Sequence, residues 1–457
     1  MELVRKILRS YQRDIVRYGR SVPHPMIFAD MRLGKTVCTI RIISSYSPSE
    51  RGLVLIVAPF SAWDGWREEL QCEGKTLNFI TGLKKKRLKI MDNIAPGWYI
   101  TNYEAWKSIG PQLRDTDWDC VVLDESDTIK SPKAKVSKFF TQNFRFVKHR
   151  FILTGTPDPE SDLDFYQQVK FCNPSIFPER NYYQFRHNWC KSTGFGFRLD
   201  PKLKEKFRTI LAKHCMFIKR SDVNLGGEQI VQKRFVRLDS KYQSIYETLE
   251  NEFIVEDKEV GIFKSTQEQF ATYVWMRALA SGVIDGHMHW RGKLEELLYL
   301  LTTQLSSEQV VVWACFDAEL YAIANALEKA KISCAVLNGK ISPENRTILK
   351  HNFQAGKFRI LVAQPEVFKY GTDLSAASTI IYFSLPVSAK TYRQSKDRTI
   401  NLQKTGSCLI IYLLTEDTID EDICDSLETK LDRSSMNHAI ARGIASRVQT
   451  RRKKYVA

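Results

Sequence analysis

The chain has 457 residues, which is enough for two or three domains of ordinary size. Its 43% hydrophobic and 26% charged residues exclude wholesale disorder. The net charge of +16 favours a polyanionic partner, because Lys and Arg side chains that neutralise phosphates release counterions. A surplus of this sign also fits a basic protein that its charge keeps soluble.

The N-terminal stretch is too charged for a signal peptide, and no segment approaches the about 18 apolar residues of a membrane span. We therefore expect neither secretion nor contact with a membrane. Ten cysteines are scattered without a Cys-x-x-Cys pair or a His/Cys cluster at zinc spacing. Several, such as Cys120 and Cys315, lie in apolar runs, which favours a reducing compartment inside a cell.

Short apolar runs of strand length alternate with stretches of helical period, and they occur in two sets. The runs include residues 53–58, 97–101, 120–123, 151–154, 310–314, 360–363, 380–383 and 407–413. Continuous apolar strands separated by helices predict parallel sheets that are covered on both faces. The sequence thus predicts an α/β protein with two doubly wound parallel-sheet lobes. A more helical region, rich in aromatic and basic residues, lies between them.

Residues 29–36, Ala-Asp-Met-Arg-Leu-Gly-Lys-Thr, precede a helical stretch and have the form of a phosphate-binding loop. Backbone N–H groups at a helix N-terminus can cradle phosphates. Lys35 would add a positive charge, and the Thr36 hydroxyl would ligate Mg²⁺. The usual pattern begins with Gly, which Ala29 replaces, and Arg32 fills another position that is often Gly. A Gly-Lys-Thr tripeptide alone is a weak signal.

Two acidic residues follow the apolar run at residues 120–123, in the sequence Asp124-Glu125-Ser126-Asp127. A carboxylate at the C-terminal tip of a strand lies where α/β sheets bind their ligands. Asp124 would hold Mg²⁺ through water, and Glu125 would orient and deprotonate the attacking water. The alternative is a solvated turn. A further predicted strand, at 151–154, is followed by small hydroxyl residues. The phosphate-binding loop, the acidic residues and this strand come in the order expected of one site, which makes coincidence a poor explanation.

These motifs resemble those of the superfamily-2 helicases and, within them, the Snf2-like DNA translocases. In the first half the matching segments are residues 8–12, where the family's Gln reads adenine, the DNA-contact motifs at 57–70 and 99–104, the coupling motif at 153–157 and the closing segment at 216–223. In the second half they are residues 292–294, 336–340, 345–353, 370–377, 392–398 and 416–421. The resemblance covers about residues 5–430.

The resemblance implies ATP and Mg²⁺ as cofactors and assigns a role to each matching position. The catalytic positions are Lys35, Asp124, Glu125 and Arg398, and the metal ligands are Thr36 and Asp124. The nucleotide contacts are Tyr11, Gln12, Arg32, Gly34, Lys35, Thr36, Gly371, Asp373 and Gln394. The DNA contacts are Pro59, Ser61, Trp63, Thr101, Asn102, Thr154, Gly339 and Thr372.

Two positions depart from the family pattern. Asp127 stands where Snf2-like members usually carry His, and Asn401 stands where the second arginine of the 392–398 motif would follow Arg398. An arginine finger is worth about 10³–10⁵ in rate, so turnover would be slow if Arg398 acted alone. Arg393 or Lys404 would be the candidates to assist it. We still expect an active enzyme, because the other catalytic positions are filled.

The resemblance implies a first RecA-like ATP-binding lobe at 1–160, a helical Snf2-type extension and linker at 161–289, a second RecA-like lobe at 290–430 and a basic tail at 431–457. ATP would bridge the two lobes and favour their closure, and hydrolysis would release them. DNA contacts from each lobe would be mostly to phosphates.

The compact chain is similar to phage-encoded branch-migration helicases. We therefore expect a monomer that translocates on duplex, forked or four-way-junction DNA in recombination, replication or repair. Its place would be the cytoplasm of a bacterium or of a phage-infected host, with the nucleus as the alternative.

Other functions stay open, namely a DNA-binding scaffold with a weak or inactive ATPase, an RNA-directed helicase, or a helicase that separates strands. The turn at 194–198 is a candidate wedge or a plain surface hairpin, and the basic runs at 84–87 and 451–454 are either DNA contacts or solvated segments.

Overall fold

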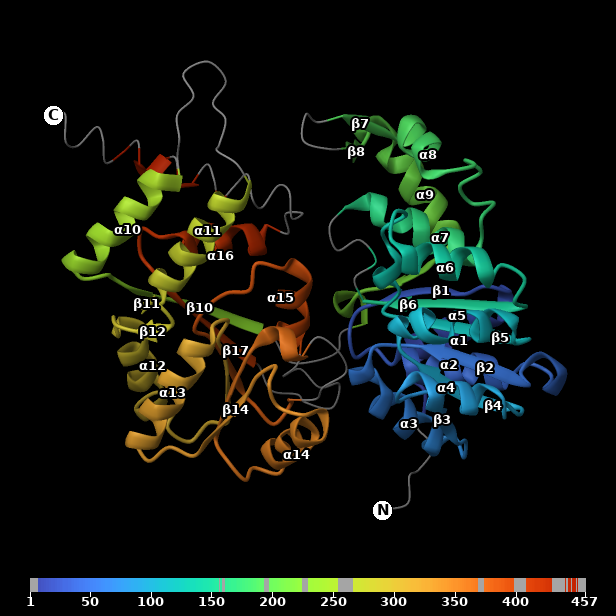
Figure 1. Cartoon of the computed structure of the whole chain (residues 1–457), viewed down its shortest axis with the longest axis horizontal. Helices are drawn as coiled ribbons and strands as arrows, with labels where there is room; N and C mark the ends of the chain where they lie inside the picture. The colour runs from blue at the N-terminus through green and yellow to red at the C-terminus, as the bar shows by residue number, and fades with distance from the viewer. Residues whose placement is uncertain are drawn as a thin grey trace. The chain divides into compact units, whose positions relative to one another are not determined.

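The computed structural model describes residues 7–155, 157, 161–192, 197–223, 229–253, 266–368, 374–397, 408–429, 440, 443–444, 446–448 and 450. Contacts divide the chain into two compact units, Met1–Leu225 and Gly226–Ala457, each built on a parallel sheet (Figure 1). The boundary falls inside the range 161–289, which we expected to hold the helical extension and the linker. Part of that range therefore belongs to each unit.

The first unit contains a seven-stranded sheet in the order β3-β4-β2-β5-β6-β1-β9, and every neighbouring pair is parallel. Its strands are β1 (Met26–Ala29), β2 (Leu53–Val57), β3 (Leu77–Phe79), β4 (Gly97–Thr101), β5 (Cys120–Asp124), β6 (His149–Thr154) and β9 (Met216–Ile218). The helices around this sheet are α1 (Ser10–Ser21), α2 (Lys35–Ser44), α3 (Trp63–Cys72), α4 (Lys84–Met91), α5 (Trp106–Asp115), α6 (Lys135–Asn143) and α7 (Phe165–Cys172).

A helical part follows β6 and α7 within the same unit. It consists of α8 (Tyr182–Trp189), the short antiparallel hairpin of β7 (Cys190–Ser192) and β8 (Phe197–Leu199), and α9 (Lys204–His214). In Figure 1 these elements lie together beyond α6 and α7, away from β3. Their aromatic side chains extend the core cluster of the unit.

The second unit contains a six-stranded sheet in the order β10-β17-β16-β13-β15-β14, again with only parallel pairs. Its strands are β10 (Gln229–Val236), β13 (Val310–Trp313), β14 (Cys334–Leu337), β15 (Ile360–Ala363), β16 (Thr379–Tyr382) and β17 (Cys408–Thr415), beside a small hairpin of β11 (Val283–Ile284) and β12 (His287–Met288). The helices are α10 (Ser240–Phe253), α11 (Thr266–Ala280), α12 (Gly292–Thr302), α13 (Asp317–Lys329), α14 (Pro343–Gln354), α15 (Ala389–Lys396) and α16 (Ile419–Glu428).

The continuous apolar runs have a structural reason, which β13 illustrates. Val311 and Trp313 belong to one buried cluster, whereas Val310 and Val312 belong to another on the opposite face of the sheet. Because successive strand residues point to opposite faces, a strand covered on both sides needs apolar residues at every position. The predicted two parallel-sheet α/β lobes are thus confirmed. No helix among the described residues is long and apolar enough to cross a membrane.

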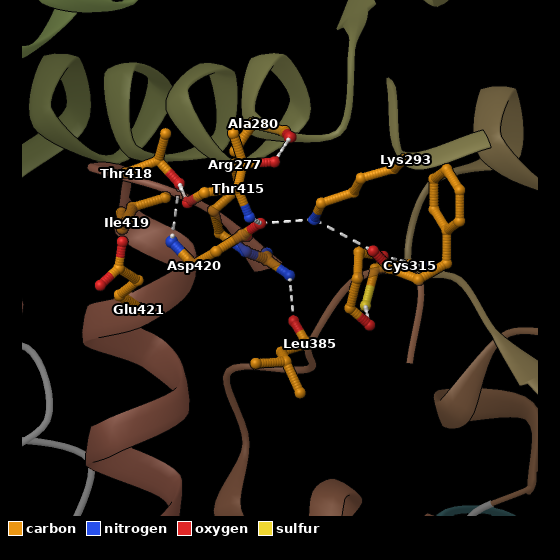
Figure 2. A network of polar contacts seen from close by, with 12 residues as sticks. Arg277, Ala280, Lys293, Cys315, Leu385, Thr415, Thr418, Ile419, Asp420 and Glu421 are labelled. Carbon is orange, nitrogen blue, oxygen red and sulfur yellow. Dashed lines mark hydrogen bonds and ion pairs between the residues drawn. The ribbon is translucent and has the colours of Figure 1, made fainter. Parts of the chain in front are cut away.

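The second unit encloses a buried ion pair between Lys293 at the start of α12 and Asp420 at the start of α16 (Figure 2). The Lys293 ammonium group also donates to the carbonyl oxygen of Phe383 at 3.1 Å, and Asp420 accepts from the backbone N–H of Thr415 at 3.1 Å. The Thr415 hydroxyl in turn donates to the carbonyl oxygen of Ala280 at 2.6 Å. The network thus ties α11, α12 and α16 to the end of β17.

Asp420→Asn should destabilise this region strongly, because it leaves the Lys293 charge buried without its counterion. Removing one partner of a buried pair costs about 3–5 kcal/mol, against about 1 kcal/mol or less for an exposed pair. Glu416→Gln is the matched control, since its partner Arg237 is 82% exposed. Hydrogen exchange of peptides from β17 and α16 measures the local free energy of opening, and equal losses in the two variants would contradict the assignment.

Candidate nucleotide-binding site

The loop between β1 and α2 makes a tight turn that depends on Gly34. This residue caps α2 with φ 80° and ψ 33°, in the left-handed region. A Cβ atom added there would lie 2.3 Å from Nε2 of Gln12, so a side chain would strain the backbone and displace the Gln12 amide. Arg32 also has a positive φ, of 66°. Ala29 is the last residue of β1, where extended backbone does not require Gly.

The side chain of Lys35 lies against the loop. Its ammonium group donates to the carbonyl oxygens of Ala29 at 2.7 Å and Asp30 at 3.2 Å. Gly34 cannot cap the helix with a side chain, and the first turn of α2, which includes Thr36, has no acidic residue. The N–H groups of that turn are therefore directed at an anion position with Lys35 beside it.

Gln12 and Tyr11 on α1 border the same loop. Gln12 donates through Nε2 to the carbonyl oxygen of Leu33 at 3.2 Å and accepts through Oε1 from the backbone N–H of Arg9 at 2.9 Å. Tyr11 is buried, and this burial raises the pKa of its hydroxyl. The Gln12 side chain is thus bound to the loop through Nε2 and to the start of α1 through Oε1.

Asp124 lies buried at the carboxyl end of β5. Its Oδ2 accepts from the indole Nε1 of Trp66 at 2.8 Å, and its Oδ1 accepts from the backbone N–H of Glu125 at 3.0 Å. Burial and then the neighbouring Glu125 charge raise the pKa of Asp124 to about 6. Such a carboxylate is poorly compensated by the protein, and a divalent cation would supply the missing positive charge.

Glu125 has an unusual backbone and an unmatched side chain. Its φ of 54° and ψ of 53° lie in the left-handed region, which is costly for a residue with a Cβ atom. Its Oε2 atom is buried and accepts no hydrogen bond from any residue that the structure describes. A buried acceptor without a partner carries a desolvation cost, so a bound water or ligand is the natural partner for this oxygen.

Gln168 on α7 links the carboxylates to the end of β6. The Ser126 hydroxyl donates to Oε1 of Gln168 at 2.8 Å, and Nε2 of Gln168 donates to the carbonyl oxygen of Pro157 at 2.6 Å. Sequence reasoning gave no role to Gln168 or to Trp66. Each of the two side chains bonds to a residue far away in the sequence. Trp66 lies in the DNA-contact motif at 57–70, and Gln168 lies in none of the predicted motifs.

A second link joins the phosphate loop to the end of the first unit. The backbone N–H of Arg220 donates to Oδ2 of Asp30 at 2.8 Å, and its guanidinium donates to the carbonyl oxygen of Met31 at 3.1 Å. Because β9 pairs with β1, residues 216–223 come next to the loop although nearly 190 residues separate them in sequence.

The positions expected to contact DNA follow the carboxyl ends of β2, β4 and β6. Pro59 and Ser61 follow β2, and both are half-buried. Thr154 is the last residue of β6 and is buried. Two of the expected side chains turn inward, because Trp63 donates to the carbonyl oxygen of Ala58 and Thr101 donates to that of Ile80. These two side chains therefore bond within the protein, and so do neighbouring backbone groups, because the N–H of Ala58 donates to the carbonyl oxygen of Thr101 at 2.9 Å.

Asn102 is buried next to α4. Its Oδ1 accepts from the guanidinium of Arg87 at 3.3 Å, and Arg87 also donates through Nε to the carbonyl oxygen of Gly82 at 2.9 Å. The basic run at 84–87 therefore begins α4 directly beside this expected contact position.

In the second unit, Gly339 is exposed after β14, and its backbone N–H donates to Oε1 of Gln364 at 3.3 Å. Gln394 on α15 is buried, and neither of its amide atoms bonds to a residue that the structure describes. Gly371, Thr372, Asp373, Arg398, Asn401 and Lys404 lie outside the described residues, as does the basic run at 451–454.

The chain matches two known protein families. The family model described as SNF2-related domain matches residues 11–285, and that of the helicase conserved C-terminal domain matches residues 292–403. A solved structure, the Sulfolobus solfataricus SWI2/SNF2 ATPase core in complex with dsDNA, is similar at 20% identity with a TM-score of 0.47, over 98% of this chain and 95% of that one.

Curated relatives were found at low identity. An uncharacterized ATP-dependent helicase of Mycoplasma genitalium is 23% identical over 91% of this chain and 41% of its own length. A SWI/SNF-related matrix-associated actin-dependent regulator of chromatin subfamily A-like protein 1 of Xenopus tropicalis is 23% identical over 93% and 44%. Putative protein p41 of Acyrthosiphon pisum secondary endosymbiont phage 1 is 23% identical over 92% and 96%. The chain thus spans less than half the length of the first two relatives.

Asp124→Asn should raise the thermal stability of the ligand-free protein near neutral pH and have less effect in acid. The raised pKa means that the folded state binds the proton more tightly than the unfolded state, so the group lowers stability as pH rises from its ordinary value of 3.8 through about 6. Melting temperatures at about pH 5 and pH 7.5, without nucleotide or divalent cation, measure the effect. Asp64→Asn, an exposed carboxylate in a surface pair, is the control; a gain that does not grow with pH would contradict the assignment.

Proposed function

Because the chain belongs to the SNF2-related family of helicases, we propose that it couples ATP hydrolysis to movement along DNA. The observation that carries the proposal is the meeting of a phosphate loop and a buried carboxylate pair at one edge of one sheet. β1 and β5 are separated by a single strand, β6, so the loop after β1 and Asp124 at the end of β5 are close neighbours. Ligands bind at this edge in open α/β sheets.

Lys35 and the N–H groups of the first turn of α2 would bind the phosphates of ATP. Binding would require Lys35 to exchange its bonds to the carbonyl oxygens of Ala29 and Asp30 for bonds to phosphate. Gln12, already held at the loop, would contact the adenine. The bound nucleotide therefore changes the contacts of a loop that is also joined to Arg220.

Thr36 and Asp124 would hold Mg²⁺, which would neutralise charge on the phosphates. The raised pKa of Asp124 fits this role, because burial leaves the charge of the carboxylate poorly compensated. Glu125 would orient the attacking water and accept its proton through the otherwise unpartnered Oε2 atom. In the second unit, Gly371, Asp373, Gln394 and Arg398 would complete the site.

The DNA would lie along the carboxyl ends of β2, β4 and β6, with Pro59, Ser61 and Asn102 as contacts, whereas the fully buried Thr154 would act from behind this edge. Gly339 and Thr372 would contribute from the second unit. Contacts would be mostly to phosphates, in keeping with the net charge of +16. We propose duplex, forked or four-way-junction DNA as the substrate, branch migration or fork reversal as the output, and a monomer as the active form.

Lys35→Ala and Glu125→Gln should both abolish DNA-stimulated phosphate release, by different routes. Lys35→Ala should weaken ATP binding, whereas Glu125→Gln should keep binding and lower kcat by about 10²–10⁴, the usual worth of a general base. Lys148→Ala, an exposed lysine of the same unit at 58% exposure, is the matched control. Wild-type protein without any nucleic-acid-stimulated turnover would point instead to a DNA-binding scaffold.

Linear duplex, forked and four-way-junction DNA of matched length and base composition should stimulate turnover to different extents. We expect the highest kcat/KM with forked or four-way DNA, because a branch offers the motor a substrate that it remodels. Phosphate release across these substrates, with single-stranded DNA and RNA added, measures the preference. Equal stimulation by all DNA forms would remove the branched-DNA proposal, and stimulation by RNA alone would remove DNA as the substrate.

A further inference from the structure

One of the strongly basic stretches of the chain lies in the helical part of the first unit. Residues 180–214 contain nine Lys and Arg residues and two acidic residues, a net charge of +7 against +16 for all 457 residues. This segment forms α8, the β7–β8 hairpin and α9. Of its basic residues Arg186 is half-buried, and the others are exposed: Arg180, Lys191, Arg198, Lys202, Lys204, Lys206, Arg208 and Lys213. A polyanion is the partner that such a surface fits.

Two exposed aromatic rings lie on this basic surface. Tyr183 on α8 is 65% exposed, and Phe197 on β8 is 39% exposed. The guanidinium of Arg186 lies 3.7 Å from the centroid of the Phe197 ring and 5.5 Å from that of Tyr183. The three side chains thus form one cluster that joins the helix to the hairpin and leaves ring surface exposed for a further stacking partner.

The cluster stands on a rigid aromatic base. Phe185 and Trp189 point inward from α8, and Trp189 packs against Phe207 of α9 with ring centroids 5.6 Å apart. The Trp189 indole donates to Oε1 of Glu179 at 2.7 Å, and the backbone N–H of Asp200 donates to the carbonyl oxygen of Trp189 at 2.8 Å. The start of α8, the hairpin and α9 are therefore held in one arrangement.

The hairpin places like charges opposite each other. Lys191 of β7 faces Arg198 of β8 in the register of the pair, an arrangement that destabilises a two-stranded ribbon. Asp200 pairs with Lys191 at 3.2 Å and offsets part of this repulsion. Two facing cations next to exposed rings favour a ligand that brings both negative charge and flat apolar surfaces.

We propose that α8 and the β7–β8 hairpin form a second nucleic-acid-binding surface that takes single-stranded DNA, with bases stacked on Tyr183 and Phe197 and phosphates on the surrounding Lys and Arg side chains. This surface is separate from the ATP site. The proposal rests on the proposed function in one respect only, namely that the nucleic acid is DNA. In a duplex the base faces are already stacked on each other, so the rings would have no partner there. Unpaired bases present free faces, which is how aromatic platforms hold single strands.

A single strand next to a duplex is the structure found at a fork or branch. The surface would hold a displaced strand there, separately from the phosphate contacts along the sheet edge. It therefore assigns a specific role to Phe197 and Arg198 of the turn at 194–198, whose residues 194–196 lie outside the described part of the chain.

The first test measures binding of labelled oligothymidylate and of a matched duplex to the full chain without ATP, by fluorescence anisotropy. Loss of stacking on one base corresponds to about 5- to 150-fold weaker binding, so Tyr183→Ala with Phe197→Ala should weaken single-strand binding by at least about 10-fold. Duplex binding and duplex-stimulated ATP turnover should stay unchanged. Phe197→Trp should retain single-strand binding, which separates stacking from mere loss of structure.

Arg145 and Phe146 provide a matched control within the same unit. Phe146 is 83% exposed, and the Arg145 guanidinium lies 4.5 Å from its ring centroid, within residues 130–150, which contain seven Lys and Arg residues and no acidic residue. Phe146→Ala should leave single-strand binding unaffected. Lys191→Ala with Arg198→Ala, on the hairpin itself, should weaken binding and reduce the salt slope by about 0.7 for each phosphate that the variant no longer neutralises.

A second test maps the binding surface directly, by ultraviolet crosslinking of an iodouracil-substituted oligonucleotide and mass spectrometry of the peptides. Crosslinks to the peptide with Tyr183 or Phe197 support the proposal, and crosslinks only elsewhere overturn it. Equal loss of single-strand and duplex binding would also overturn it. Competition by polyglutamate as strong as that by oligothymidylate would overturn it in favour of an acidic protein partner. Because these assays need no ATP, loss of turnover with intact single-strand binding would count against the proposed motor function and not against this surface.

Discussion

The parallel direction of the strands in the seven-stranded and six-stranded sheets is the constraint on which the rest of this structure depends. When all strands run the same way, their carboxyl ends meet at one edge, and the residues that follow them become neighbours regardless of their distance in sequence. In the first unit this places the loop at residues 30–34, Asp124 and Thr154 on one edge. The apolar strands that secure this arrangement are buried on both faces, so site and core are products of the same pattern.

The two units treat buried charge in opposite ways. In the second unit Lys293 and Asp420 neutralise each other, and further hydrogen bonds satisfy them, so the pair fixes α12 and α16 without calling for a ligand. In the first unit Asp124 and Glu125 are both acidic and both buried, and an oxygen of Glu125 has no partner among the described residues. Like charges that are brought together out of water raise the free energy of the empty site. A cation and a water would relieve that cost, and for this reason the arrangement is suited to binding.

The sequence predicted the two parallel-sheet α/β lobes, because apolar runs are local patterns, whereas the roles assigned to the site residues stay predictions. The eight apolar runs named from the sequence agree with their strands to within two residues, and Asp124 ends β5, whereas β1, β3, β9 and β14 correspond to none of these runs. The contacts of Trp66 and Gln168 could not be read in this way, because they join parts of the chain 58 and 42 residues apart. The strand β10 was not predicted, for another reason. It lies at a sheet edge, and its partly exposed positions include Lys233 and Arg234, so its sequence lacks the continuous apolar run of a buried strand.

Net charge shows most clearly what structure adds to composition. At the level of the whole chain, +16 suits a DNA-binding protein and a merely soluble one equally well. Local concentration distinguishes them, because repulsion among cations makes a cluster costly unless an anion is bound there. Residues 180–214 carry that cost on a surface where Arg186 also holds two exposed rings in place. Solubility alone requires neither the clustering of charge nor exposed aromatic rings, whereas a strand with free bases and phosphates matches both.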